Sequence, residues 1–274
     1  MHTKKKYIKN SQNNDNIKKR KRKLEFILTS FLFIIVLVLF VMSPIFNVSN
    51  VSVYGNNHYT AQEIVKASEV VTGVNGFTDI GGTYKHYISL RYGQAEKKII
   101  GKCPYIEEVS VKYSVPSKVI IQVKERNPIV LIPYLGSYLL VDRNGYVVDI
   151  INSDNKFNLP NIKGIKFKEY EIGHCLKIEN KESFEELIIL IDTLTEEDKS
   201  DTFKIAEIID TIDISDSNNI YFFIDSRLVV NIGGLDELNY KIKSLKQIYF
   251  KNISKEEKGF LDFTAGEHPV FIPN

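Results

Sequence analysis

Hydrophobic and polar positions are unevenly distributed along the chain, and the longest apolar run lies near its start. Residues 26–46 (FILTSFLFIIVLVLFVMSPIF) are 21 residues long and carry no charge. A helix of this length covers roughly 31 Å, which matches the hydrocarbon core of a bilayer. Pro44 lies near the far end of the run, where a helix can stop at little cost. The run therefore predicts a transmembrane helix.

The two flanks of this run differ sharply in charge. Residues 1–25 contain ten Lys or Arg and two acids, and the first charge after Glu25 is Glu63. The positive-inside bias thus places the N-terminus in the cytoplasm and the chain beyond the run outside. A cleaved signal peptide is disfavoured, because the apolar run is too long and no A-x-A-like site follows it. The basic cluster at 18–23 resembles a nucleic-acid patch, but beside a spanning helix it is better explained as a topology signal.

After the apolar run, alternating residues indicate strands and residues at helical spacing indicate helices. Thr60 and Glu63 form a capping-box pattern at the start of one helix, and Gly73 ends it. The predicted elements are a strand at 46–54, this helix, a loop at 74–87, a helix at 89–101, and strands at 105–113 and 118–125. The order β-α-α-β-β indicates a small sheet with two helices on one face.

Each of these two helices has a predicted apolar stripe. In the first helix the stripe comprises Ala61, Ile64, Val65, Ser68 and Val71, and in the second Ile88, Tyr92, Ala95 and Ile99. These side chains are expected to face the sheet.

The remainder of the chain predicts a second, strand-rich region. Its predicted elements are a strand–turn–strand at 137–150, helices at 181–195 and 236–251, and strands at 206–214, 220–224, 227–232 and 260–264. The fold class is therefore α+β, with a single N-terminal transmembrane helix, a β-α-α-β-β domain and a second mixed, β-rich domain. The expected boundaries are a basic tail without regular structure at 1–25, the transmembrane helix at 26–46, domains at 47–126 and 127–266, and a C-terminal tail at 267–274.

Composition changes this picture in one respect. Residues 1–25 carry a net charge of +8 and the whole chain +2, which leaves −6 for the rest. The basic character therefore belongs to the tail, and the exported part has no charge pattern that suggests nucleic acid.

No motif predicts catalysis or a bound cofactor. The sequence contains no G-x-S-x-G, H-E-x-x-H, P-loop or G-x-G-x-x-G pattern, and its five His are scattered. Cys103 and Cys175 are too few for a disulfide framework, and whether they pair stays open. His174 beside Cys175 lacks the further ligands of a metal site. We expect no enzyme activity, no cofactor and no metal.

Several short patterns together resemble the FtsQ/DivIB family of bacterial division proteins, whose anchor precedes an FtsQ-type POTRA domain. The chain has V-x-V-x-G-N, T-x-x-x-I, P-Y-I-x-x-V-x-V and I-x-V-x-E-R-x-P in this order after the anchor. The residues that carry the resemblance are Val51, Val53, Gly55, Asn56, Thr60, Ile64, Pro104, Tyr105, Ile106, Val109, Val111, Pro116, Ile121, Val123, Glu125, Arg126 and Pro128. The segment 78–89 is longer than the family pattern, and Thr264 replaces the family's closing Arg.

The resemblance implies a non-enzymatic membrane scaffold of the division septum. The implied partners are bitopic coiled-coil proteins of the FtsL and DivIC/FtsB type and the septal penicillin-binding transpeptidase. The contact expected from the family falls on two strands, and its candidate residues are Leu228, Val229, Val230, Asn231, Ile232, Phe260, Leu261, Asp262 and Phe263. Exposed sheet edges could accept a partner strand there. The alternatives are a membrane-anchored cell-wall enzyme or sensor, or a POTRA-bearing translocation component.

Overall fold

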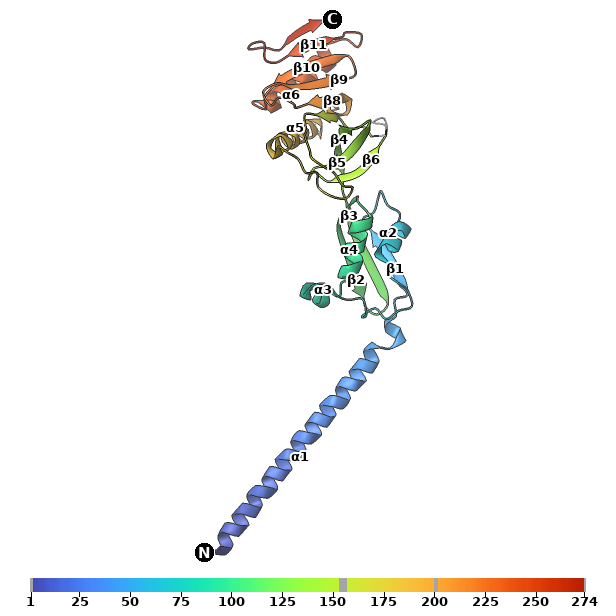
Figure 1. Ribbon diagram of the computed structural model, residues 1–274, viewed down its shortest axis with the longest axis vertical. Helices are drawn as coiled ribbons and strands as arrows, with labels where there is room; N and C mark the ends of the chain where they lie inside the picture. Colours follow the sequence, from blue (N-terminus) through green and yellow to red (C-terminus); the bar gives the residue numbers. More distant parts are fainter. Residues whose placement is uncertain (1, 153–156, 200–201, 274) are drawn as a thin grey trace. The chain divides into compact units, whose positions relative to one another are not determined.

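The chain folds into two compact units, the first of which begins with a long helix (Figure 1). A computed structural model describes residues 2–152, 157–199 and 202–273, so Met1 and Asn274, the ends of the two expected tails, lie outside it. The first unit comprises residues 1–54, 61–97 and 110–122. The second comprises residues 55–60, 98–109 and 123–274.

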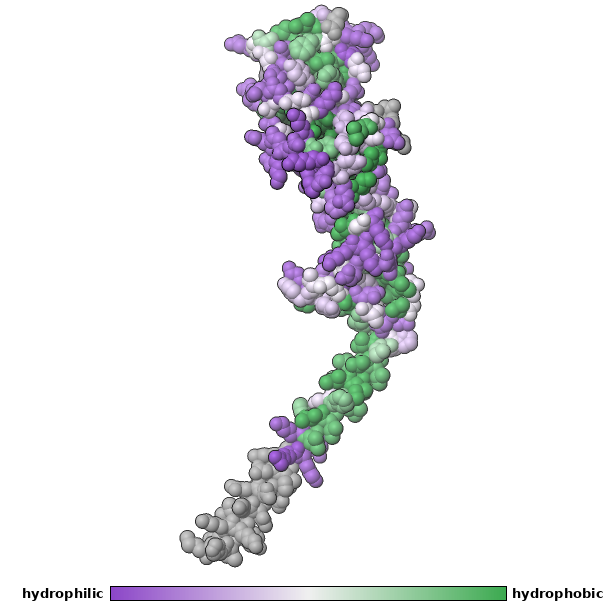
Figure 2. Space-filling view, viewed as in Figure 1, coloured by the Kyte–Doolittle hydropathy of each residue, from purple (hydrophilic) through white to green (hydrophobic). Residues whose placement is uncertain are grey.

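Helix α1 runs from His2 to Val41 without interruption. Its stretch Arg20–Val41 is long and apolar enough to cross a membrane, and none of it is buried by the protein. Phe26 and Phe33 are about 70% exposed, at 72% and 69%. A continuous apolar surface of this kind, green in Figure 2, matches a lipid environment rather than water.

Two expectations about this helix are wrong. The basic tail at 1–25 was expected to lack regular structure, but it continues α1, because Lys and Arg are good helix formers and an existing helix extends at low cost. The apolar run was expected to be helical to residue 46, but α1 ends at Val41. A separate 3-10 turn, Pro44–Phe46, follows it.

The first sheet has the predicted β-α-α-β-β order, with one additional short helix. Its elements are β1 (Asn50–Tyr54), α2 (Ala61–Ser68), α3 (Tyr84–Ser89), α4 (Gly93–Lys102), β2 (Ile106–Ser114) and β3 (Lys118–Glu125). The strand order is β1-β3-β2, and β1 pairs in parallel with β3, so that Val51 lies beside Val119.

The predicted helical stripes are correct except at their ends. Ile64, Tyr92 and Ile99 are at most 1% exposed, whereas Val71 is 59% exposed and Ile88 80%. Left-handed backbone at Glu69 ends α2 before Val71. Left-handed backbone at Leu90 separates α3 from α4, so Ile88 lies on a different helix from Tyr92. The expected loop at 74–87 therefore contains the start of α3.

The structure explains why the V-x-V-x-G-N pattern has a glycine at position 55. Its φ is +85°, and a Cβ placed there would lie 2.1 Å from the Val123 carbonyl oxygen. Both the left-handed backbone and the close approach require glycine.

We therefore expect Gly55→Ala to lower the free energy of unfolding by about 1–3 kcal/mol. Chemical unfolding of the full chain in detergent, followed by circular dichroism, measures this loss. Gly101→Ala is the matched control, because among the described residues no atom beyond its chain neighbours and the backbone of its own helix lies within 4 Å of its Cβ position. Equal effects of the two substitutions would contradict this explanation.

The second unit contains a nine-stranded mixed sheet. Its strands are β4 (Pro128–Tyr134), β5 (Ser137–Asp142), β6 (Val147–Ile151), β7 (Asn161–Lys163), β8 (Ile209–Asp213), β9 (Ile220–Ile224), β10 (Leu228–Gly233), β11 (Gly259–Asp262) and β12 (Val270–Pro273). The strand order is β12-β11-β10-β9-β8-β7-β4-β5-β6. Two helices accompany the sheet, α5 (Lys181–Lys199) and α6 (Leu238–Gln247), and a π-helical turn, Ile248–Asn252, continues α6.

One face of this sheet forms the main core with the two helices. Leu187 and Leu194 of α5 and Ile242 of α6 are buried in the same cluster as Phe222 and Val230 of the sheet. The predicted strands at 220–224 and 227–232 and the predicted helix at 181–195 are confirmed to within a few residues. The strand predicted from residue 206 begins later, because a 3-10 turn, Ala206–Ile208, precedes β8.

Candidate partner-binding site

The nine residues expected to contact partners lie on β10, on β11 and directly after β11. These two strands are parallel neighbours, with Val229 beside Phe260 and Asn231 beside Asp262. The sequence-distant segments 228–232 and 260–263 are therefore brought together. Neither strand is an edge, because β9 flanks β10 and β12 flanks β11.

Burial divides these nine residues into two sets. Leu228, Val230, Asn231, Ile232 and Leu261 are at most 5% exposed. The side chains of those five therefore support the sheet from within. Val229, Phe260, Asp262 and Phe263 are half-buried and reach the surface.

Two of the half-buried residues, Val229 and Phe260, belong to a row that crosses four strands. Val229 lies beside Phe223 of β9 on one side and Phe260 of β11 on the other. Phe260 in turn lies beside Ile272 of β12. Because side chains alternate between the faces of a strand, this row lies opposite the core face that holds Val230. We call Phe223, Val229, Phe260 and Ile272 the outer apolar row.

Strand β12 forms the edge at which this row ends. The segment 267–274 was expected to be a tail, but Val270–Pro273 pairs antiparallel with β11. Within the described residues no strand pairs with its other side. Its Val270 and Ile272 are 45% and 53% exposed. An edge of this kind offers main-chain hydrogen bonds to an incoming strand, and the outer apolar row offers it side-chain contacts.

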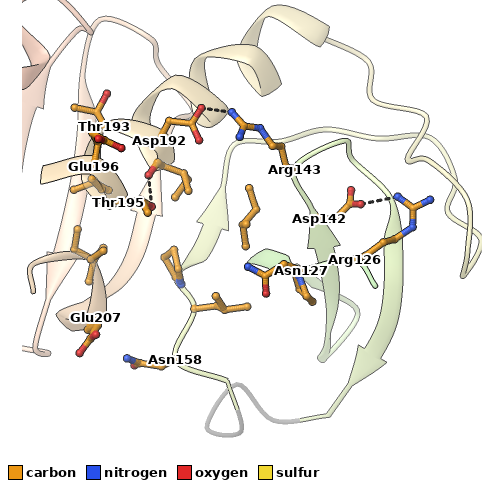
Figure 3. A pocket seen from close by; sticks show the side chains of 18 of the residues that line it. Arg126, Asn127, Asp142, Arg143, Asn158, Asp192, Thr193, Thr195, Glu196 and Glu207 are labelled. Carbon is orange, nitrogen blue, oxygen red and sulfur yellow. Dashed lines mark hydrogen bonds and ion pairs between the residues drawn. The ribbon is translucent and has the colours of Figure 1, made fainter. Parts of the chain in front are cut away.

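The second unit also has a groove (Figure 3). It has a volume of about 930 Å³ and is lined by residues of β3–β5, α5 and the segment before β8. Four of its charged groups form two ion pairs, Arg126 with Asp142 and Arg143 with Asp192. These pairs hold the chain segments around the groove together.

The E-R-x-P pattern has a structural explanation at this groove. The Glu125 carboxylate accepts hydrogen bonds from the backbone N–H groups of Asn57, His58 and Tyr59, at 2.7–3.1 Å. Arg126 donates to Asp142 at 2.8 Å. These two side chains fasten the end of β3 to the loop after β1 and to the turn after β5.

The reactive side chains show no catalytic arrangement among the described residues. No disulfide joins Cys103, which is buried, to Cys175, which is exposed. Burial raises the pKa of the Cys175 thiol, which disfavours the nucleophilic thiolate. Burial also raises the pKa of Tyr59 and Tyr105 to about 12, so both remain protonated at neutral pH. No group of three or more His, Cys, Asp or Glu could hold a metal ion within the described ranges.

The described residues combine an apolar N-terminal helix long enough to span a membrane, a β-α-α-β-β domain, and a mixed sheet that ends in the edge strand β12. This combination is that of a POTRA protein with an N-terminal membrane anchor. The family of FtsQ-type POTRA domains matches residues 46–126. The cell division protein DivIB of Clostridium botulinum (strain Hall) is 27% identical over 261 residues, which cover 93% of each chain. DivIB of Clostridium tetani is 27% identical over 232 residues, covering 83% of this chain and 79% of the relative. DivIB of Enterococcus faecalis (strain 62) is 24% identical, covering 92% of this chain and 61% of the relative.

Residues 46–126 thus form an FtsQ-type POTRA domain, and most of the chain is similar to the DivIB cell division proteins. The motifs between Val51 and Pro128 that indicated the family fall almost entirely inside the matched domain.

Proposed function

We propose that this protein acts in bacterial cell division as a non-enzymatic membrane scaffold. Its relatives are named cell division proteins, which supports a role in the division machinery. The scaffold binds bitopic coiled-coil partners of the FtsL and DivIC/FtsB type at the septum and links them to the septal transpeptidase. The observation that carries the proposal is the unpaired edge of β12 beside the outer apolar row.

The proposed topology places the N-terminus in the cytoplasm and both units outside. Figure 2 shows hydrophilic side chains, in purple, next to the apolar part of α1, where residues 20–23 are all Arg or Lys. Basic residues at one end of a span favour the cytoplasmic side. The anchor confines the protein and its partners to the membrane plane, which raises their effective concentration, so an interface of modest affinity suffices.

A substitution that places a charged side chain in the outer apolar row tests whether partners bind at β12. We expect Ile272→Asp to weaken binding by about 2 kcal/mol or more, because the charge would be buried against the partner strand. Co-purification of the full chain with tagged FtsL- and DivIC-type partners from detergent-solubilised membranes measures the loss. Val229→Asp, in the same row, is expected to act in the same direction.

The matched control is Ile189→Asp on α5. Ile189 is 52% exposed and Ile272 53%, so the two substitutions disturb similarly exposed positions of the same unit. Circular dichroism confirms that each variant is folded. Normal binding by a folded Ile272→Asp variant, or equal loss in both variants, would remove the β12 edge from the proposal.

A further inference from the structure

Exposed apolar side chains of the first unit gather at one end of its sheet. Beyond α1 they include Ile45, Val74 and Val115, and the α3 residues Tyr84, Tyr87 and Ile88. Ile88 is 80% exposed and Tyr84 71%, among the highest values for apolar residues of the chain. Tyr54, which is 58% exposed, lies instead at the C-terminal end of β1.

Hydrogen bonds identify this end as the one at which α1 enters the unit. The Asn75 side chain donates to the carbonyl of Val41, the last residue of α1, at 2.8 Å. The backbone N–H of Val48 donates to the Val74 carbonyl at 2.9 Å. Val74 and its neighbours are thus held within a few residues of the end of the spanning helix.

Helix α3 is also attached at the end of the sheet where α1 enters the unit. The Tyr113 N–H donates to the carbonyl of Leu90, the residue that caps α3, at 2.8 Å. The Tyr113 hydroxyl donates to the Phe46 carbonyl, also at 2.8 Å. Tyr113 therefore connects the base of α3 to the 3-10 turn that follows α1.

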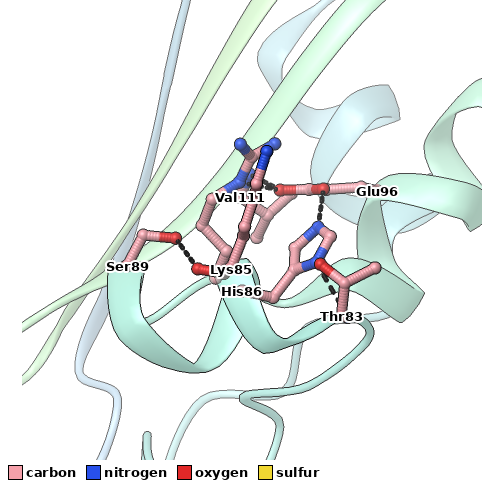
Figure 4. A network of polar contacts seen from close by, with 7 residues as sticks. Thr83, Lys85, His86, Ser89, Glu96 and Val111 are labelled. Atoms are coloured by element: carbon pink, nitrogen blue, oxygen red, sulfur yellow. Dashed lines mark hydrogen bonds and ion pairs between the residues drawn. The ribbon is translucent and has the colours of Figure 1, made fainter.

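A polar network around the buried carboxylate of Glu96 holds α3 in place (Figure 4). Nε2 of His86 lies 3.0 Å from the carboxylate of Glu96, which is 7% exposed. The same carboxylate accepts hydrogen bonds from Arg91 at 2.7 Å and from the Val111 N–H at 2.9 Å. Nδ1 of His86 accepts from the Thr83 N–H at the start of α3. The apolar side chains of α3 are thus presented on a fixed helix.

The composition of this helix fits the interface between lipid and water. Tyr side chains combine an apolar ring with a hydroxyl and concentrate at the headgroup level, and Lys85 between them can reach lipid phosphates. A fixed apolar face exposed to water would be costly, whereas at the bilayer surface it is buried in the headgroup region.

We infer that α3 and the neighbouring residues Val74 and Val115 lie on the outer surface of the bilayer, with Tyr84, Tyr87 and Ile88 in the headgroup layer. This contact fixes the first unit against the membrane as a second attachment beside α1. The inference rests on α1 spanning the membrane as proposed above. The occupant of this surface is phospholipid.

Tryptophan fluorescence tests the contact, because the chain contains no Trp. Full-length Tyr87→Trp is reconstituted in phosphatidylcholine nanodiscs that contain a nitroxide quencher at the headgroup. Its emission is expected to be blue-shifted and quenched several-fold more than that of the matched control Tyr54→Trp. Tyr54 and Tyr87 are equally exposed, at 58% and 60%, so they differ in place rather than in accessibility.

Two further variants make the outcomes distinct. Leu37→Trp, within α1, reports the span through a lipid carrying the quencher on its acyl chain. Ile88→Asp added to Tyr87→Trp is expected to reduce quenching at position 87. If position 37 is quenched and position 87 behaves like position 54, α3 does not contact lipid and the inference is overturned, while the anchor stands. If position 37 is not quenched, the anchor and the inference both fall.

Discussion

Replacing Arg126 by alanine is expected to lower the free energy of unfolding by about 3–5 kcal/mol. The side chains of Arg126 and Asp142 are only 9% and 4% exposed, and their N–O distance is 2.8 Å. The guanidinium also lies 3.7 Å above the ring of Tyr146. Truncation leaves the buried Asp142 carboxylate with backbone donors alone, and it removes the packing on the tyrosine.

Urea unfolding of the full chain in detergent measures the effect, and a double-mutant cycle with Asp142→Asn isolates the coupling between the two side chains. Arg126→Lys keeps the charge but not the planar fork, so an intermediate loss is expected. Hydrogen exchange should rise first in β5 and β6, the strands joined by the turn that Asp142 holds. A loss below about 1 kcal/mol, the value typical of surface pairs, would show that the pair is not buried in solution.

Asp198→Ala is also expected to lower the free energy of unfolding by about 3–5 kcal/mol, here through lost contacts between α5, α6 and the segment before β8. Asp198, near the end of α5, accepts the backbone N–H groups of Ile205 and Ala206 at 3.0 and 2.8 Å. It also pairs with Lys246 of α6 at 3.0 Å, and both side chains are less than 10% exposed. The substitution removes the carboxylate beside the buried Lys246 ammonium, which keeps its hydrogen bond to the Glu197 carbonyl, and it removes the acceptor of two backbone N–H groups.

The neighbouring pair Lys243–Glu197 supplies the control for this prediction. It joins the same two helices at 3.4 Å, but Lys243 is 64% exposed. We expect Lys243→Ala to lower the free energy of unfolding by at most about 1 kcal/mol, because water screens the pair. Thermal unfolding of both variants, followed by circular dichroism, gives the comparison; similar shifts in Tm would refute the argument from burial.

The sequence predicted the elements whose signal is local. The strand at 118–125 and the helix at 181–195 have clear periods of two and 3.6, and both form as expected. Strand β4 was missed because Ile129–Ile132 is a continuous apolar run between two prolines, which lacks the alternation of a half-buried strand. Strand β7 is three residues long, too short to show a period.

The candidate site was located only in part, for a related reason. Strands 227–232 and 260–264 were found from their own patterns. That they are parallel neighbours, and that β12 covers the second of them, depends on pairing between distant segments. No local signal reports such pairing, so residues on inner strands could not be separated from those at an edge. The outer apolar row became visible only through the register of four strands.

The parallel pairing of β1 with β3 has a consequence for the order of events during synthesis. Ser49, which directly precedes β1, donates a hydrogen bond to the carbonyl of Ser117, 68 residues later. At a synthesis rate of about 5–20 residues per second, roughly 3–14 s separate the synthesis of these two residues. Throughout that interval β1 lacks the strand with which it pairs. A chain that stalls before β3 would therefore contain β1 without its parallel partner, so this sheet can form only after β3 has been made.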